Sequence, residues 1–132
     1  MLDTNVVLDA IAAREPFRKD TDAIFALIGK NILTGYVTAS SVTDIYYVLR
    51  RKLSDDTCRK ALWHLFDLFS AVPVFQEDCE EALGVPMEDF EDALIYVCAR
   101  KSGVDYIVTR DEGFLKTNNA ISPSDFLALA PF

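Results

Sequence analysis

The stretch Asp105-Tyr106-Ile107-Val108-Thr109-Arg110-Asp111 decides the fold class, because its centre is the clearest candidate for a buried strand in the chain. The central residues are aromatic or β-branched, the side chains that suit a pleated and buried surface. A strong helical pattern precedes the stretch over residues 88–101, and Gly103 ends that pattern. A helix that leads into a short apolar strand is the unit from which parallel sheets are built.

The same alternation extends through the rest of the chain. Further short β-type runs are expected at residues 1–3, 36–39 and 72–75. Helices are expected at residues 5–13, 21–28, 40–49, 54–69 and 78–83, and after Ser122-Pro123. The pattern predicts an α/β fold, a three-layer sandwich with a short-stranded parallel sheet and helices on both faces. We expect one such domain to account for all 132 residues (1–132).

The composition indicates a chain with a packed core. Hydrophobic residues make up 51% of it and Gly and Pro are scarce, which excludes a disordered chain. The sequence has no apolar run of membrane-spanning length and no signal-peptide pattern, so we expect a cytoplasmic protein. Cys58, Cys79 and Cys98 are widely spaced and far from the single histidine, His64. That spacing argues against disulfide bonds and against a thiolate zinc site.

The net charge is an objection to a nucleic-acid partner. The chain has 13 Lys and Arg against 21 Asp and Glu, which gives −8 at neutral pH. A protein that binds nucleic acid through a broad basic surface has the opposite balance. A divalent cation among several carboxylates would reverse the local field, and a basic protein partner would cover part of the acidic surface. Composition leaves both explanations open.

Four acids, however, occupy equivalent places in the predicted fold. Asp3 ends the first strand, Asp44 lies in the first turns of the helix after residues 36–39, and Asp92 lies early in the helix of residues 88–101. Asp111 comes two residues after the strand that ends at Thr109. Because ligands of open α/β sheets bind beyond the carboxyl ends of the strands, we expect these four carboxylates to meet at one rim.

Carboxylates that meet in this way need a counter-charge. Oxygen ligands without a nearby cysteine or histidine favour Mg²⁺ or Mn²⁺ over zinc. Such a cation lowers the pKa of a bound water and stabilises the leaving oxygen of a phosphodiester, so that no histidine base is required. The sequence therefore predicts a hydrolase for nucleic acid with Asp3, Asp44, Asp92 and Asp111 as catalytic residues.

Each acid also has a purely structural interpretation. Asp44 stands three residues after Ser41, in the arrangement of a capping box. Asp92 suits the positive end of a helix dipole, and Asp111 suits a turn. Other acids nearby are expected on a solvated face, and Asp89 is the one among them most open to a functional role: Asp9, Glu88, Asp89 and Glu91.

Four blocks of the sequence resemble one known family, the PIN domains. Residues 3–6 (Asp-Thr-Asn-Val) with Asp9 resemble its opening motif, and residues 89–94 (Asp-Phe-Glu-Asp-Ala-Leu) are similar to its third-acid helix. Residues 106–111 are similar to its fourth-acid strand and turn, and residues 122–127 (Ser-Pro-Ser-Asp-Phe-Leu) to its closing segment. The blocks follow one another in the family's order and cover essentially the whole chain.

The resemblance implies a function as well as a fold. It implies an endoribonuclease with Mg²⁺ or Mn²⁺ at an acidic site, and many members are VapC-like toxins that are dimeric and inhibited by a small antitoxin protein. By position, Asp3, Asp92 and Asp111 would be metal ligands, with Asn5, Thr109 and Asp89 as supporting residues. Arg110 would be near enough to contact a phosphate of the RNA substrate. A homodimer and an antitoxin partner are therefore expected.

Two departures from the family pattern are visible. Asp44 stands where members usually have glutamate, so a direct metal contact there could become water-mediated. Only Met1 and Leu2 precede Asp3, whereas members have a longer apolar strand at this place. We therefore expect either that the true start lies upstream or that the central strand is short. A charged α-amino group at Met1 would lie close to the metal, which is unfavourable.

Other functions remain open. Loss of activity through Asp44 or the short first strand would leave a binding or regulatory module. A phosphatase that uses an aspartate nucleophile needs a second acid two residues after Asp3, where this chain has Asn5, and a receiver domain needs a different pattern of acids. Tyr46 and Tyr47 are expected to serve packing rather than base stacking. Six cations are candidates for RNA contact but equally suit helix ends: Arg14, Arg50, Arg51, Lys52, Arg100 and Lys101.

Overall fold

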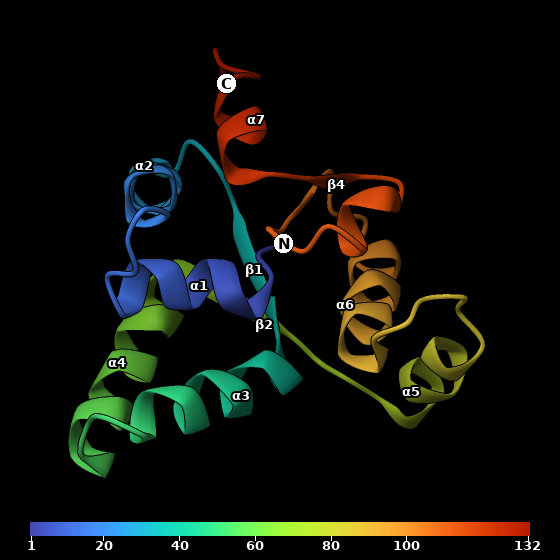
Figure 1. Cartoon of the computed structure of the whole chain (residues 1–132), viewed down its shortest axis with the longest axis horizontal. Coiled ribbons are helices and arrows are strands. Elements are labelled where there is room, and N and C mark those ends of the chain that lie inside the picture. Colours follow the sequence, from blue (N-terminus) through green and yellow to red (C-terminus); the bar gives the residue numbers. More distant parts are fainter.

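The computed structural model describes all 132 residues and has helices on both sides of a set of short strands (Figure 1). The helices are α1 Thr4–Ile11, α2 Arg18–Gly29, α3 Ala39–Arg50, α4 Asp55–Leu68, α5 Gln76–Leu83, α6 Phe90–Lys101 and α7 Pro123–Leu127. The strands are β1 Gly35–Thr38, β2 Phe69–Val72, β3 Ile107–Val108 and β4 Ala120–Ile121, and Phe114–Lys116 forms a 3₁₀ turn. None of the helices is both long and apolar enough to cross a membrane.

The strands form two parallel pairs that the N-terminal residues join. β1 pairs with β2, and β3 pairs with β4. Leu2 N donates to Tyr36 O at 2.9 Å on one side, and Asp3 N donates to Val108 O at 3.0 Å on the other. Residues 1–3 thus lie between β1 and β3 in a parallel arrangement, which gives the order β2-β1-N-terminus-β3-β4.

Side chains that alternate along these strands build a separate hydrophobic core on each face. Leu2, Val37 and Val108 point into a core with the layer of α1 to α4 and with α7. Their neighbours Met1 and Ile107 point into a second core with α5 and α6. Figure 1 shows the strands between these two groups of helices. The three-layer α/β sandwich expected from the sequence is therefore confirmed.

The boundaries differ from the expectation in two places that matter for the site. The strand expected at residues 72–75 is β2, Phe69–Val72, because Phe69 and Val72 are the residues buried in the two cores and Pro73 has no N–H to donate. The helix expected to begin at Ser40 or Ser41 begins at Ala39, directly after β1. Thr38 caps it, since Thr38 Oγ1 accepts a hydrogen bond from Ser41 N at 3.1 Å.

The close packing of β1 against β2 leads to a test of the fold. A Cβ atom added at Gly35 would lie 2.6 Å from Phe69 Cδ1 and 2.9 Å from Ile28 Cδ1. We expect Gly35→Ala to lower the free energy of unfolding by about 1–3 kcal/mol, the usual cost of overpacking. Gly84→Ala is the control, because the nearest atom there is Glu81 O at 3.5 Å. Equal urea midpoints for the two variants would contradict the packing described.

Candidate active site at the carboxyl ends of the strands

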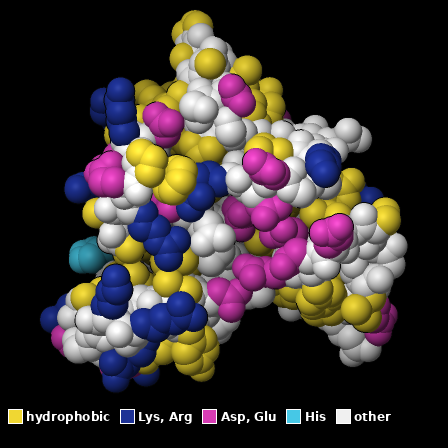
Figure 2. All heavy atoms as spheres, viewed as in Figure 1, with side chains coloured by type: hydrophobic (Ala, Val, Ile, Leu, Met, Phe, Trp, Pro, Cys, Tyr) yellow, Lys and Arg dark blue, Asp and Glu magenta, His cyan; other side chains and the backbone are white.

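The four predicted acids are brought to one edge of the sheet. Asp3 ends the N-terminal segment and precedes α1, Asp44 lies in α3, Asp92 lies in the first turn of α6, and Asp111 follows β3. Figure 2 shows a continuous band of Asp and Glu side chains across the centre of this face. The band lies between the helix layer of α1 to α4 and that of α5 and α6. The convergence inferred from strand ends is thus present in the structure.

Thr109 fixes Asp3. The Thr109 side chain is fully buried, and its Oγ1 donates to Asp3 Oδ2 at 2.8 Å. Asp3 itself is only 4% exposed. Burial raises the pKa of Asp3, the hydrogen bond from Thr109 opposes that rise, and the charge of Asp111 adds to it. One hydroxyl therefore holds a buried carboxyl in a defined orientation.

The same hydroxyl also positions Asp111. Thr109 Oγ1 accepts a hydrogen bond from Asp111 N at 3.1 Å, and Asp111 Oδ1 accepts one from Phe114 N at 2.8 Å. Phe114 is fully buried, so the turn after β3 is anchored in the second core. The turn role considered for Asp111 is therefore real, but it uses a single carboxyl oxygen. The side chain is exposed at the edge where the other acids lie.

Asp92 shows most clearly how closely the acids approach one another. Its pKa is raised from 3.8 to about 7, first by burial and then by the charges of Asp3, Asp89, Asp111 and Glu91. Asp89 caps α6, because Asp89 Oδ1 accepts a hydrogen bond from Asp92 N at 3.0 Å. Asp89 thus holds the first turn of α6 that carries Asp92, and it also adds negative charge beside it.

Glu91 is a site residue that the sequence analysis missed. It was expected on a solvated face, but it is half-buried, and its Oε1 accepts a hydrogen bond from Thr4 Oγ1 at 3.0 Å. Burial raises its pKa, and the charges of Asp44 and Asp3 add to that rise. Asp44 therefore faces Glu91 across the gap between α3 and α6. The capping-box interpretation of Asp44 is wrong, because Thr38 is the cap of α3.

Arg110 is held by Asp9, and its contact with a phosphate stays a prediction. Its Nε and Nη2 donate to Asp9 Oδ2 and Oδ1 at 2.5 and 3.0 Å. Its guanidinium lies 3.7 Å from the centre of the Phe17 ring. Asp9 is fully buried, so its assignment to a solvated face is wrong as well. Asn5 is exposed and accepts from Arg14 Nη1 at 3.3 Å rather than contacting the acids.

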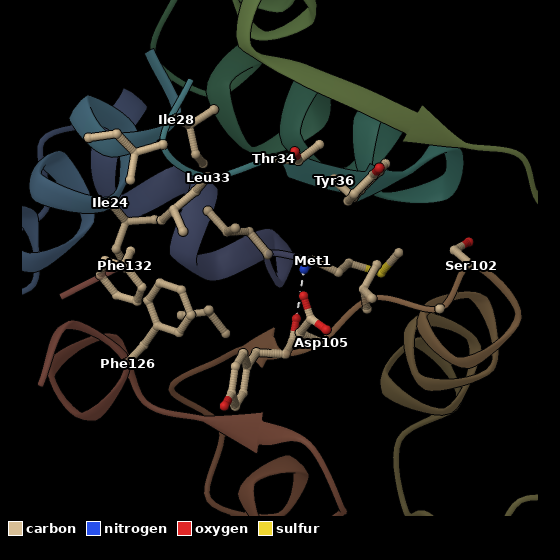
Figure 3. A pocket seen from close by; sticks show the side chains of 16 residues that line it. Met1, Ile24, Ile28, Leu33, Thr34, Tyr36, Ser102, Asp105, Phe126 and Phe132 are labelled. Atoms are coloured by element: carbon tan, nitrogen blue, oxygen red, sulfur yellow. Dashed lines mark hydrogen bonds between the residues drawn. The ribbon is translucent and has the colours of Figure 1, made fainter. Parts of the chain in front are cut away.

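One cavity lies away from this site, at the amino ends of the strands. It has a volume of about 440 Å³, is mainly apolar, and lies around Met1 at the opposite edge of the sheet (Figure 3). The α-amino group of Met1 donates there to Tyr106 O at 2.7 Å, and burial lowers its pKa to about 5. The unfavourable effect expected of this amino group on a bound metal stays a prediction. His64 is exposed on α4 and far from both places in the fold.

No three acidic, histidine or cysteine side chains form a ready-made set of metal ligands in this conformation. The carboxyls of Asp3, Glu91 and Asp92 instead share a raised pKa, which burial causes first and the charges of neighbouring carboxylates increase further. A cluster of this kind binds protons or a cation. The arrangement suits oxygen-based coordination chemistry at the rim of an α/β sheet.

Comparison with known proteins identifies the fold family. A family model described as the PIN domain matches residues 1–113. The chain belongs to the PIN domain family. A curated relative, Ribonuclease VapC1 of Aquifex aeolicus (strain VF5), is 24% identical over 118 residues, which cover 86% of this chain and 81% of that protein.

Two solved structures share the fold of this PIN domain. A toxin–antitoxin complex from Klebsiella pneumoniae matches with a TM-score of 0.70 and 16% identity, covering 92% of this chain and 95% of that chain. VapBC2 from Rickettsia felis, bound to a DNA fragment from its promoter, matches with a TM-score of 0.66 and 17% identity over the same shares. At these identities the likeness establishes the fold.

The buried ion pair of this PIN domain gives a stability prediction. Arg110→Met would leave the fully buried Asp9 with only Arg14, whose Nη1 is 3.9 Å away. We expect the free energy of unfolding to fall by about 3 kcal/mol, because an unpaired buried charge is costly. The matched control is Arg59→Met, which removes an exposed pair with Asp55 that solvent already screens. Urea unfolding of both variants measures the difference, and equal losses would contradict the importance of the Asp9 pair.

The raised pKa of Asp92 predicts how stability depends on pH. In the presence of a chelator, the native state holds a proton on Asp92 up to about pH 7, whereas an ordinary aspartate loses it near 3.8. The native state therefore binds more protons than the unfolded chain in this window, and the free energy of unfolding falls as pH rises through it. The α-amino group of Met1 titrates in the opposite sense, so the measured quantity is the difference between wild type and Asp92→Asn. A difference that is constant from pH 4 to 7 would contradict the raised pKa.

Proposed function

We propose that this PIN domain is an endoribonuclease that hydrolyses RNA phosphodiesters with Mg²⁺ or Mn²⁺, and that it is the toxin of a toxin–antitoxin pair. The observation that carries the proposal is the meeting of Asp3, Asp92 and Asp111 at one edge of the sheet, where Thr109 bonds to both Asp3 and Asp111 and the charges of these two acids raise the pKa of Asp92 beyond the effect of burial. Membership of the PIN domain family and similarity to a protein named as a ribonuclease support it.

The residues present fit a divalent metal. The donor set is made of carboxylates alone, the ligands that Mg²⁺ and Mn²⁺ prefer. Burial and mutual repulsion raise the pKa of Asp3 and Asp92, and a divalent cation relieves the same repulsion that otherwise retains protons. We assign Asp3, Asp92 and Asp111 as its ligands. Because no trio is ready-made, metal binding requires side-chain rotation, and Asp92 is the partly exposed member with no side-chain hydrogen bond to hold it.

The neighbouring residues position the proposed ligands or add further carboxylates to the site. Thr109 keeps Asp3 and Asp111 in a fixed relation through one hydroxyl, and Asp89 holds the turn that carries Asp92. Glu91 and Asp44 supply further carboxylates on the side of α3, where Glu91 offers the longer side chain that Asp44 lacks. A bound divalent cation would lower the pKa of a water and stabilise the leaving oxygen. A histidine base is then not required.

The proposal includes a protein partner. The Klebsiella pneumoniae structure is described as a toxin–antitoxin complex, and the Rickettsia felis structure as VapBC2 bound to a DNA fragment from their promoter. We propose that a small antitoxin binds this chain as well. An antitoxin that carries basic residues to the acidic band would match the net charge of −8.

Removal of one carboxylate tests the site. We expect Asp92→Asn to reduce Mn²⁺-dependent cleavage of a mixed single-stranded RNA pool by at least about 100-fold, because even residues that only support metal ligands usually contribute 10–100-fold. The same variant should lose heat of Mn²⁺ binding in calorimetry. Asp67→Asn is the control, since Asp67 is an exposed acid on α4.

The outcomes separate the competing functions. Cleavage that persists unchanged in Asp92→Asn would show the site assignment to be wrong. A wild type that binds Mn²⁺ but cleaves no RNA would instead favour the weakened binding or regulatory module. A wild type that neither binds Mn²⁺ at millimolar concentration nor cleaves RNA would overturn the nuclease proposal as a whole.

A further inference from the structure

The charge of the chain is unevenly distributed along the sequence. Residues 14–60 contain nine Lys and Arg against six Asp and Glu, whereas the rest of the chain contains four against fifteen. The net charge of −8 is therefore the sum of a positive segment and a strongly negative remainder. The positive segment includes α2, α3 and the start of α4. Figure 2 shows most of the visible Lys and Arg side chains on one side of the acidic band, on the same face of the molecule.

One helix connects the acidic band to this basic region. Asp44 lies in the second turn of α3, close to Glu91, and Arg50 and Arg51 lie at the other end of the same helix. Positions 44, 47 and 51 follow a spacing of three and four residues, which places them on one face of a helix. That face therefore presents a carboxylate, an aromatic ring and a guanidinium in sequence: Asp44, Tyr47 and Arg51.

Tyr47 is exposed, contrary to the packing role expected for it. The side chain is 68% exposed, although tyrosine in a folded domain usually has much of its ring covered. Its ring makes an edge-to-face contact with Tyr46 at 5.4 Å, and the hydroxyl of Tyr46 donates to Asp55. Tyr46 is therefore the tyrosine that packs, and its hydroxyl is anchored. Tyr47 exposes an oriented ring to solvent, between the acids and the basic end of α3.

The cations at the C-terminal end of α3 form no salt bridge within the molecule. Arg51 and Lys52 are exposed and form no salt bridge, whereas Arg50 donates to Leu53 O at 3.0 Å and lies beside Tyr46 and Asp55. By contrast, Arg100 and Lys101 on α6 are paired with Glu81 and Asp78. Of the six cations considered from the sequence, Arg51 and Lys52 are thus the ones available to an external anion.

We propose that single-stranded RNA reaches the acidic site along α3, with a base stacked on Tyr47 and a backbone phosphate bound by Arg51. This inference rests on the proposed function and adds the path of the substrate to it. An aromatic ring beside a cation is the combination that binds single strands, because every base has a face to stack and every nucleotide carries a phosphate. On this path the RNA backbone meets the acidic band, and is repelled by it, only at the cleavage position.

Binding and chemistry are tested separately. With divalent metal removed by a chelator, fluorescence anisotropy of a short labelled single-stranded RNA of mixed sequence measures binding along this path without cleavage. We expect Tyr47→Ala to weaken binding about 5-fold or more and Tyr47→Phe to restore it, since stacking requires the ring and not the hydroxyl. Arg51→Gln should lower the dependence of log affinity on log salt by about 0.7, the value for one phosphate contact of a single strand.

Two controls match these variants in kind. Trp63→Ala removes another exposed aromatic ring, on α4, and Lys30→Gln removes another exposed cation, at the end of α2 beside the edge of the sheet opposite the acids. Both should leave RNA binding unchanged. Circular dichroism and urea midpoints test whether Tyr47→Ala is folded. If it is not, Tyr47→Phe and Arg51→Gln, each compared with wild type, test the proposal.

Cleavage in Mn²⁺ then distinguishes this inference from the proposed function. We expect Tyr47→Ala and Arg51→Gln to raise KM with little change in kcat, because they remove ground-state binding, whereas Asp92→Asn lowers kcat. If Asp92→Asn is inactive but both α3 variants bind and cleave like wild type, the path is wrong and the nuclease stands. α3 variants that bind RNA normally but lose affinity for an antitoxin would assign this face to the protein partner instead. If wild type binds RNA through Tyr47 but never cleaves it, the path stands and the nuclease fails.

Discussion

The backbone hydrogen bonds of residues 1–3 are the constraint on which the rest of the structure depends. β1–β2 and β3–β4 are separate two-stranded pairs, and such pairs have little stability alone. Leu2 bonds to Tyr36 on one side and Asp3 bonds to Val108 on the other, so one short segment joins the pairs into a single layer. Leu2 and Met1 also contribute to different cores. The segment therefore couples the two helix layers, and its last residue is Asp3.

The position of Asp3 explains why the acids lower the stability of the fold and are still well ordered. A carboxyl at the end of a buried central segment loses hydration, and this loss raises its pKa. Thr109 compensates in part, and it can do so because β3 lies directly beside the segment. The acids of α6 are added to this fixed pair from the other helix layer. The two hydrophobic cores thus stabilise a fold in which neighbouring carboxylates repel one another. Such local destabilisation is expected where a fold is shaped for function rather than for stability alone.

Much of this could be predicted from the sequence, and the failures have physical causes. The alternation of helices and short apolar strands was sufficient for the fold class, and strand ends were sufficient to predict that Asp3, Asp92 and Asp111 lie near one another. β2 was misplaced because Phe69 continues the apolar stripe of the preceding helix equally well. Asp9 and Arg110 are about a hundred residues apart, and nothing local indicates that they pair. Glu91 and Asp92 are adjacent on α6, and only the rotation of that helix against Thr4 shows that both face the site.

The net charge was the weakest guide to function, for a reason that the structure makes explicit. At physiological ionic strength, charges farther apart than about 8 Å are largely screened from one another, so a phosphate responds to the side chains near it and not to the sum over the chain. The acids are concentrated where a cation would neutralise them, and the cations without internal partners lie at the end of α3. A chain with a charge of −8 therefore offers an anion a locally positive approach. For the proposed RNA substrate, what matters is the order of charges along α3, from Asp44 to Arg51, and that order follows from helix geometry.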